Sequence, residues 1–319
     1  MRWLIAALVV LAAIAGGGAW YARHLYRGPG PLAEARDVVI PPGTIASVGV
    51  VLQHQGVIDN ALVFRAAAEL TARQGPLQAA EFAFPAHASL AMVLGVLRHG
   101  SPVQHKITIP EGLTAAQIAA ELEKSKVLSG PVRVPPEGAV MPQTYDVTLG
   151  TTREALLARA EAAMRATVAK VWAGRAPDLP LASPEQLVTL ASMVERETAL
   201  PGERARIAGV FVNRLRIGMM LQSDPTVAFA VSGGKSTDGA GLTEADLRFD
   251  SPYNTYRVKG LPPTPICSPG LASLEAAAHP LATKDLYFVA NGTGGHAFAA
   301  TLEQQNRNVA KWRALNRGK

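Results

Sequence analysis

The chain has 319 residues, of which 48% are hydrophobic and 18% charged, and its net charge is +6. This length predicts roughly two domains, and the hydrophobic share argues against wholesale disorder. Cys267 is the single cysteine, which excludes an intramolecular disulfide and a multi-cysteine zinc site. The sequence has no run of five Lys or Arg residues, so the positive charge is dispersed and nucleic acid is a weak candidate partner.

The first segment is long and apolar enough to cross a membrane. The stretch from Trp3 to Trp20 has 18 residues without a charge, which is just enough for a ~30 Å hydrocarbon core. Trp3, Trp20 and Tyr21 lie at its ends, where aromatic rings favour the interface. A cleaved signal peptide is the alternative, since residues 13–15 (Ala-Ile-Ala) resemble a cleavage site. We favour an uncleaved single-pass anchor because the apolar run continues to Trp20.

Residues 38–58 and 107–128 form a degenerate repeat. Both copies begin with apolar-x-Ile-Pro-x-Gly and continue with Thr and an apolar pattern at helical spacing. Each copy predicts a short strand, a Pro-Gly turn and an amphipathic helix capped by Thr44 or Thr114. Between the copies we expect a helix at 62–70, a strand at 81–84 and a helix at 89–97. Such modules often bind glycans, but repeats of this kind are more often plain scaffold.

The second half begins after a Pro/Gly-rich boundary loop at 135–145. Periodicity predicts a long helix over 154–172 and another that starts at Ser183, an N-cap followed by Pro. The last turn of this second helix carries Glu195 and Glu197. They point about 160° apart, because successive helical residues turn by about 100°. The two carboxylates therefore cannot act as a pair on one substrate bond.

Its position in the helix favours Glu197 as the carboxylate that takes part in catalysis. It is nearer to the helix C-terminus, where the dipole disfavours an anion, and partial burial would also raise its pKa. A carboxyl group that is protonated near neutral pH can act as a general acid. Thr198 beside it could supply a hydroxyl. Glu195 would then face one of the nearby cations Arg196, Arg204 and Arg206. A surface pair of glutamates at a helix end is the alternative, and the residues alone favour it.

The segment after these glutamates carries further polar side chains. A helix over 203–215 contains Asn213 near its end. The polar turn at 221–226 contains Gln222 and Asp224. Asp224 is expected to cap the following helix, and a role as a site carboxylate is the alternative.

Two later segments complete the set of candidates. The SPYNTY loop at 251–256 has an aromatic and amide composition that suits sugar faces and hydroxyls, although a structured connector would look the same. A β-hairpin with an Asn-Gly turn is expected over 285–299, and its His296 is interpreted as structural. The histidines show no metal-binding spacing. The candidate substrate-binding residues are Glu195, Thr198, Asn213, Gln222, Asp224, Tyr253, Asn254 and Tyr256.

A series of motifs runs in order through the second half. It starts with residues 190–227, which contain Glu-Arg-Glu-Thr, and continues with SPYNTY, GLPPTPI, AAAHP and LYFVANGTGGHAF. PEG at 136–138 and PxTY at 142–145 precede it. Together these motifs resemble the endolytic murein transglycosylase family, also called the MltG or YceG-like family. The family's catalytic glutamate is the second Glu of its E-[KR]-E-T motif, which falls on Glu197. The chain departs from the family pattern at Gln143, Ser268 and Gln305.

The resemblance implies an α+β fold with an N-terminal transmembrane helix, LysM-like strand-helix modules and a mixed α+β catalytic domain. The expected domains are a membrane anchor and linker at 1–28, a LysM-like region at 29–134 and a YceG-like catalytic domain at 135–319. The resemblance also implies a single-pass protein of the cell inner (plasma) membrane. Its catalytic part would lie on the periplasmic or extracytoplasmic side.

The activity implied is that of a lyase, a peptidoglycan lytic transglycosylase. It would cleave the MurNAc-GlcNAc bond of nascent glycan strands, leave an anhydro-MurNAc end and so terminate elongation. Glu197 would protonate the leaving oxygen and then take the proton of the attacking muramyl hydroxyl. No cofactor or metal is expected; the partners would be glycan strands, with peptidoglycan synthases as further candidates. The alternatives are a muramidase-type hydrolase that uses Asp224 as a second carboxylate, and a non-catalytic glycan-binding protein.

Overall fold

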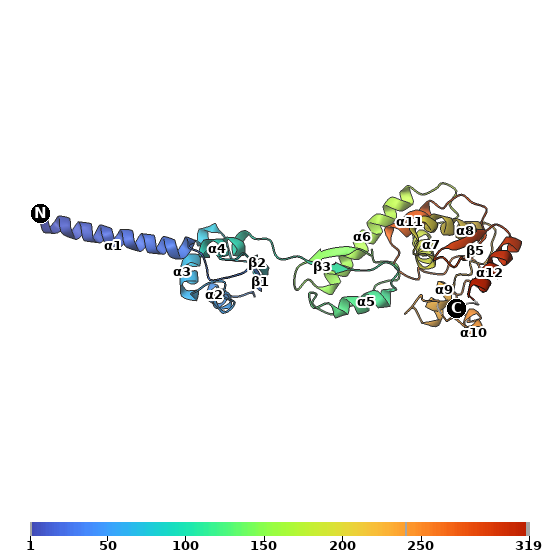
Figure 1. Cartoon of the computed structure of the whole chain (residues 1–319), viewed down its shortest axis with the longest axis horizontal. Helices are drawn as coiled ribbons and strands as arrows, with labels where there is room; N and C mark the ends of the chain where they lie inside the picture. Colours follow the sequence, from blue (N-terminus) through green and yellow to red (C-terminus); the bar gives the residue numbers. More distant parts are fainter. Residues whose placement is uncertain (1, 240, 317–319) are drawn as a thin grey trace. The chain divides into compact units, whose positions relative to one another are not determined.

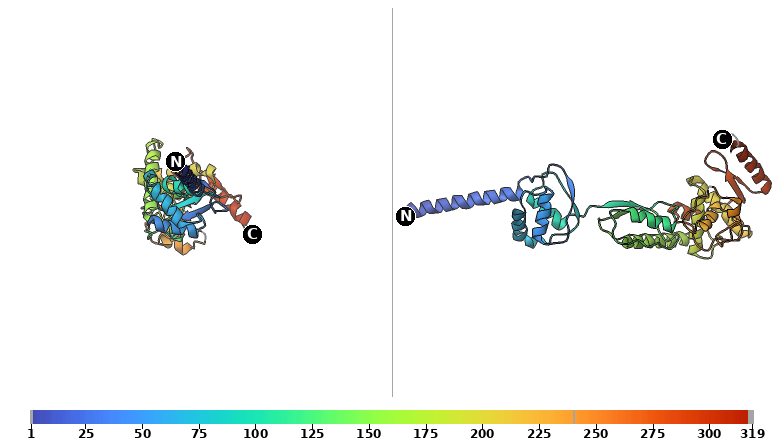
Figure 2. Two further views of the ribbon diagram at one scale, coloured as in Figure 1. Left: turned by 90° about the vertical axis from the view of Figure 1, so that its left-hand side faces the viewer. Right: turned by 90° about the horizontal axis from the view of Figure 1, so that it is seen from below.

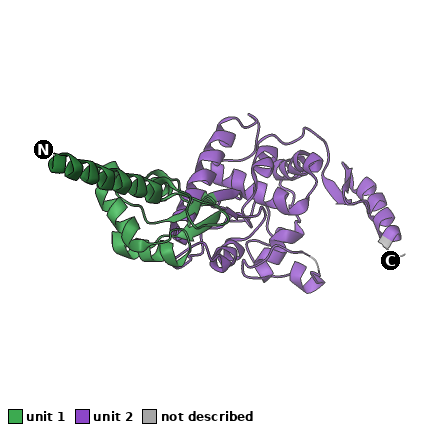
Figure 3. Cartoon of the chain, turned by 60° about the vertical axis from the view of Figure 1, so that its left-hand side comes forward, with its two compact units in different colours: residues 1–105, 146–149 green, residues 106–145, 150–319 purple. Residues whose placement is uncertain are grey.

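The computed structural model describes residues 2–239 and 241–316, and the chain divides into two compact units (Figure 3). The first unit comprises the chain up to residue 105 together with 146–149. The second comprises residues 106–145 and the rest of the chain. Helices are combined with short two-stranded sheets, so the predicted α+β class is confirmed.

Helix α1 (Arg2–Arg27) is the N-terminal element and buries none of its residues (Figure 1). Of the helices that the structure describes, it is the one long and apolar enough to cross a membrane. Length and composition carry this assignment, and a signal sequence near the N-terminus would share both properties. The predicted apolar span is therefore present as a continuous helix.

The rest of the first unit packs helices against one two-stranded sheet. Strands β1 and β2 are antiparallel with Val38 opposite Phe82, and both side chains lie in the core. Helix α2 begins at the predicted cap Thr44, whose Oγ1 accepts the N–H of Ser47 at 3.2 Å. The elements are β1 (Arg36–Val39), α2 (Ile45–His54), α3 (Ala61–Leu70), the 3-10 helix η1 (Ala72–Gln74), β2 (Glu81–Phe84) and α4 (Leu90–His99).

The second copy of the repeat forms the start of the second unit. It folds as β3 (His105–Thr108) and α5 (Ala115–Lys124), and β3 pairs with β4 (Thr144–Val147). Thr114 and Gln117 form a reciprocal capping box at the start of α5, as the sequence predicts for Thr114. Both copies thus adopt the expected strand, turn and helix.

The turn between β3 and α5 is bonded to the C-terminal half of the chain. The N–H of Gly112 donates to Ser268 O at 2.9 Å, and the N–H of Ser268 donates to Leu113 O at 2.9 Å. Gly112 has a φ of 76°, which glycine adopts without steric cost. These contacts place residues 106–145 in the second unit, whereas the sequence predicts one region over 29–134. That functional division stays a prediction.

Helix α7 (Pro184–Glu197) lies in the core of the second unit. All its residues from Leu187 to Val194 are buried, and α7 contacts four surrounding helices. Figure 1 shows α7 among these helices. The predicted start of α7 is confirmed, since Ser183 Oγ accepts the N–H of Gln186 at 3.4 Å. The surrounding helices are α6 (Arg153–Ala173), α8 (Arg204–Arg216), α9 (Asp224–Val231) and α11 (Leu271–Ala278), with η2 (Pro201–Glu203) and α10 (Glu244–Leu247) between them in sequence.

A β-hairpin and a final helix complete the second unit. Strands β5 (Tyr287–Ala290) and β6 (His296–Ala299) form the predicted antiparallel pair, with Phe288 opposite Phe298. The predicted Asn-Gly turn is part of a longer loop, in which the N–H of Asn291 donates to Gly295 O at 2.8 Å. Phe288 contacts Phe211 of α8 edge-on at 6.0 Å, which seats the hairpin on the core. Helix α12 (Leu302–Asn316) packs beside both strands (Figure 2).

Candidate active site

The two glutamates in the last turn of α7 have different surroundings, as their helical spacing predicts. Glu195 Oε2 accepts the N–H of Gly270 at 3.0 Å, and Glu195 Oε1 lies 4.0 Å from Arg204 Nη2. Glu197 instead accepts a hydrogen bond from the hydroxyl of Ser223 at 2.5 Å. Glu195 therefore holds the start of α11 and faces Arg204, one of the three predicted cations.

Glu111 belongs to the same cluster as Glu195. Its carboxylate occupies the space in which a Cβ on Gly270 would lie. Burial raises the pKa of Glu111, and the negative charge of Glu195 raises it further, whereas Arg204 lowers it. The carboxylates of Glu111 and Glu195 and the guanidinium of Arg204 thus lie around the start of α11. The contacts of Glu195 therefore stabilise the fold at this point.

Ser223 is held in place by two buried threonines. Its N–H donates to Thr255 Oγ1 at 2.9 Å, and Thr226 Oγ1 donates to Ser223 O at 2.7 Å. The two threonine hydroxyls lie 2.8 Å apart. Gln222 has a φ of 51° and donates its N–H to Thr255 O at 3.0 Å. Because satisfied buried polar networks are rigid, the hydroxyl of Ser223 is aimed at Glu197.

Burial raises the pKa of Glu197 to about 7. The hydrogen bond from Ser223 acts in the opposite direction, and the negative charge of Asp224 raises the pKa. The positive charges of Arg214 and Arg196 lower it. The residue keeps partial exposure to solvent, although protein surrounds the carboxyl group. Such a group can both give and accept a proton near neutral pH.

Asp224 and Tyr256 lie beside Glu197. The hydroxyl of Tyr256 donates to Asp224 Oδ1 at 2.6 Å. Burial raises the pKa of Tyr256, and its hydrogen bond to Asp224 and the charge of Glu197 act in the same direction. The phenol therefore stays protonated at neutral pH. The expectation that Asp224 caps α9 is wrong: Ser223 occupies the N-cap position, and Tyr256 binds the carboxylate of Asp224.

Arg214 of α8 supports the loop that carries Ser223. Its Nη1 donates to Leu221 O at 2.7 Å, and its Nε donates to Leu286 O at 2.6 Å. The side chain is buried, and burial lowers the pKa of Arg214. The guanidinium thereby links α8 to the loop before α9 and to the residue before β5.

Two predicted amide side chains have backbone partners. Asn213 Nδ2 donates to Thr283 O at 2.8 Å and to Asp285 O at 3.0 Å. Asn254 is buried, and its Nδ2 donates to Phe249 O at 2.8 Å. Both amides therefore hold loops by hydrogen bonds to backbone carbonyls. Residue composition alone cannot distinguish this role from the binding of sugar hydroxyls.

The remaining candidates also have partners within the protein. Thr198 Oγ1 donates to Glu203 Oε2 at 3.3 Å. The ring of Tyr253 packs against Phe229 at 5.0 Å, and its hydroxyl lies 2.8 Å from Thr264 Oγ1. The structure thus brings together Glu197, Ser223, Asp224 and Tyr256, and it gives other partners to Glu195, Asn213, Tyr253 and Asn254. The role of each in substrate binding stays a prediction.

In the described part of the chain, no group of three or more His, Cys, Asp or Glu residues is arranged to hold a metal ion. Cys267 is buried, and its Sγ donates to Ser192 O at 3.3 Å. Burial raises the pKa of this thiol, so it is protonated and packs as a core side chain.

Comparison with known protein families assigns the chain to a family. The family model described as YceG-like matches residues 38–311. This chain belongs to the YceG-like family. The match covers both copies of the repeat, the last turn of α7 and the hairpin, and it confirms the resemblance carried by the sequence motifs.

Relatives of this YceG-like chain are named endolytic murein transglycosylase. The relative from Streptococcus pneumoniae serotype 2 (strain D39) is 30% identical over 97% of this chain and 65% of its own length. The relative from Bacillus subtilis (strain 168) is 36% identical over 57% of this chain and 49% of its own length. The chain therefore spans less than two thirds of the length of these curated relatives.

A solved structure supports the fold of this YceG-like chain. The crystal structure of a YceG-like protein from Listeria monocytogenes is 29% identical and matches with a TM-score of 0.54. The match covers 86% of this chain and 98% of that protein. The α+β fold is thus shared with an experimentally solved YceG-like protein.

Three residues of this YceG-like chain are not predicted from its sequence as members of the site: Ser223, Arg214 and Glu203. A Ser before Asp-Pro is an N-cap signal, and it marks Ser223 as a residue at the start of a helix. Arg214 and Glu203 carry no local signal, because one partner of each, Leu286 for Arg214 and His296 for Glu203, lies far away in the sequence. His296, which the sequence predicts to be structural, pairs its ring Nδ1 with Glu203 Oε2 at 2.7 Å.

Proposed function

We propose that this chain is an endolytic peptidoglycan lytic transglycosylase. It cleaves the β-glycosidic bond between MurNAc and GlcNAc in nascent glycan strands and leaves an anhydro-MurNAc end, which terminates elongation. The names of the relatives support this proposal. The observation that carries it is Glu197, a carboxyl group with a pKa of about 7 at the position of the family motif.

Glu197 performs both proton transfers of the reaction. It first gives its proton to the glycosidic oxygen while the bond from this oxygen to the anomeric carbon breaks. The C6 hydroxyl of the same muramyl sugar then attacks that carbon, and its proton passes to Glu197. No water is consumed, and Glu197 ends in its initial protonation state. Between the two transfers, the Ser223 hydroxyl stabilises the carboxylate by its hydrogen bond.

Hydrolysis of the same bond is the second candidate function, and Asp224 is the observation that favours it. A glycosidase needs a second carboxylate as nucleophile or as base. Asp224 lies close enough to Glu197 for its charge to raise the pKa of Glu197. The Tyr256 hydroxyl binds one oxygen of Asp224, and this bond reduces the nucleophilicity of the carboxylate. We therefore favour the internal muramyl hydroxyl as the nucleophile.

We also propose that α1 is an uncleaved anchor in the cell inner membrane, with the rest of the chain on the periplasmic or extracytoplasmic side. The apolar helix supports the anchor, and the location of peptidoglycan supports the side. Residues 29–134 act as a LysM-like region that binds or orients glycan, an idea supported by the strand-turn-helix copies. Peptidoglycan synthases are candidate partners at the site of strand synthesis.

Product analysis tests this function. The full chain in detergent is incubated with purified uncrosslinked glycan strands, and the products are analysed by mass spectrometry. We expect new anhydro-MurNAc ends, which are lighter by one water than hydrolysed ends. Reducing ends alone would establish the hydrolase instead, and intact strands would leave a glycan-binding protein.

A further inference from the structure

The residue after Glu197 has an extended backbone. Thr198 has φ −148° and ψ 137°, so the chain leaves the helix abruptly after Glu197. The helix does not continue past Glu197, so contacts outside α7 hold the chain at Thr198.

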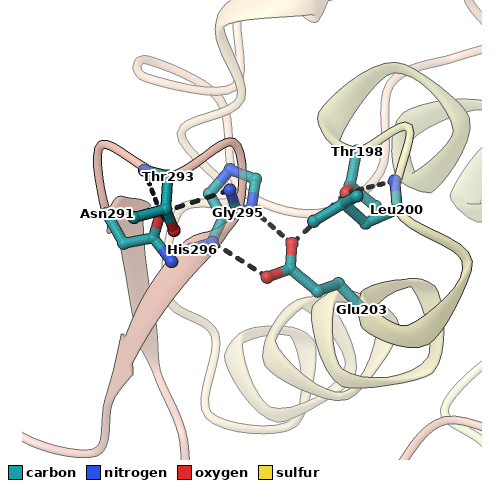
Figure 4. A network of polar contacts seen from close by, with 7 residues as sticks. All are labelled: Thr198, Leu200, Glu203, Asn291, Thr293, Gly295 and His296. Atoms are coloured by element: carbon teal, nitrogen blue, oxygen red, sulfur yellow. Dashed lines mark hydrogen bonds and ion pairs between the residues drawn. The ribbon is translucent and has the colours of Figure 1, made fainter.

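The side chain of Thr198 is fixed by a network shown in Figure 4. Its Oγ1 accepts the N–H of Leu200 at 3.0 Å and donates to Glu203 Oε2 at 3.3 Å. Glu203 also accepts two hydrogen bonds from His296, one from its N–H at 2.8 Å and one from its ring Nδ1 at 2.7 Å. Since a carboxylate can only accept, Nδ1 carries the proton. Burial acts to raise the pKa of Glu203, but the bonds from His296 outweigh burial and the pKa is lowered.

The hairpin end of this network is anchored in the core. The ring of His296 contacts Phe288 edge-on at 5.4 Å, and Phe288 packs against Phe211 of α8. A Cβ placed on Gly295 would lie 2.7 Å from Glu203 Oε1, so the glycine permits the carboxylate to approach β6. The network therefore ties the residue after Glu197 to a rigid hairpin that lies far away in the sequence.

We propose that Glu203 and His296 are positioning residues for the transglycosylase reaction: they hold Thr198, and through it they fix the backbone that carries Glu197. This inference rests on the proposed function, in which Glu197 is the acid. Neither residue needs to touch the substrate. A small displacement of an acid costs rate because proton transfer requires a short, aligned donor.

The test compares variants that remove or restore single links of the network. Thr198→Val removes the hydroxyl at nearly constant volume, and Thr198→Ser restores it. His296→Ala removes the ring donor, and His296→Asn restores an N–H donor near the position of Nδ1. The control is Thr293→Val in the hairpin loop, which removes a hydroxyl bonded to Asn291 and not to Glu203. Each variant is assayed for kcat and KM on glycan strands well below its melting temperature, beside Glu197→Gln.

We expect Thr198→Val and His296→Ala to lower kcat by about 10- to 100-fold with KM within about twofold, since a misplaced acid costs rate on this order. Thr198→Ser and His296→Asn should recover most of kcat, and Thr293→Val should match the wild type. If Thr198→Val and His296→Ala lower only the melting temperature and keep wild-type kcat, the network is merely structural and the inference is overturned. If Glu197→Gln itself still forms anhydro ends, the proposed function fails first, which separates the two failures.

Discussion

The hydroxyl of Ser223 and the carboxylate of Glu197 meet at 2.5 Å, and this hydrogen bond joins the start of α9 to the end of α7. It stabilises the charged form of an acid that burial favours as neutral, so the two effects oppose each other in the pKa of Glu197. The result is a carboxyl group with a pKa of about 7, which depends on its surroundings and not on the glutamate side chain alone.

Glu197→Gln should abolish most bond cleavage. The amide keeps the size of the side chain but has no proton to transfer, and general acid–base catalysis contributes typically about 10²–10⁴-fold. Glu195→Gln is the matched control, and we expect a much smaller loss of rate because Glu195 bonds Gly270 and faces Arg204. Anhydro-ended product and thermal unfolding are measured for both. An inactive Glu195→Gln beside an active Glu197→Gln would reverse our assignment.

The pH–rate profile should report Glu197. The acid must start protonated, so kcat/KM should fall as pH rises through about 7. Ser223→Ala removes a bond that lowers the pKa, so the pKa should rise and the alkaline limb should move to higher pH. Ser232→Ala, at the other end of α9, should leave the limb in place. An alkaline limb that is identical in Ser223→Ala and the wild type would contradict this role of Ser223.

Asp224→Asn should move the same limb in the opposite direction. The negative charge of Asp224 raises the pKa of Glu197, so its removal should lower that pKa and shift the loss of kcat/KM to lower pH. Anhydro ends should still form, because the muramyl hydroxyl is the nucleophile in the proposed reaction. Complete loss of cleavage in Asp224→Asn, together with hydrolysed ends in the wild type, would favour the hydrolase.

Glu137 should make stability depend on pH. Both of its oxygens accept the N–H of Ala115, at 2.9 and 3.1 Å, and burial raises the pKa of Glu137 to about 7. The folded state therefore binds this proton more tightly than the unfolded chain, so this group's contribution to the free energy of unfolding falls as pH rises from about 4.5 to 7. Glu137→Gln should remove that slope in urea unfolding. Glu123→Gln, exposed on α5, should retain it, and an equal slope in all three proteins would refute the prediction.

Gly295→Ala should destabilise the contact between β6 and η2. The added Cβ would lie 2.7 Å from Glu203 Oε1, and overpacking of this kind typically costs about 1–3 kcal/mol. The free energy of unfolding, measured by urea, should fall by that amount. Unchanged stability would show that Glu203 moves aside without loss.

The local elements and the different directions of Glu195 and Glu197 follow from sequence patterns alone. Ser183, Thr44 and Thr114 are caps in the structure because a cap depends on residues within one turn. Glu195 and Glu197 face different surroundings because helical geometry separates residues that lie two apart. The motifs around them also indicated the family, which the match to residues 38–311 confirms.

The partners of Glu197 and Glu203 depend on how the whole chain packs. Ser223 reaches Glu197 and His296 reaches Glu203 across 26 and 93 residues of sequence. No local periodicity encodes such pairs, because they depend on how α7, α9 and the hairpin pack around a shared core. The same reason explains the environment of Asp224. The local pattern predicts a helix cap, whereas in the folded chain the carboxylate accepts a hydrogen bond from Tyr256. Burial, which sets the pKa of Glu197, is likewise a property of the packed chain and not of its last helical turn.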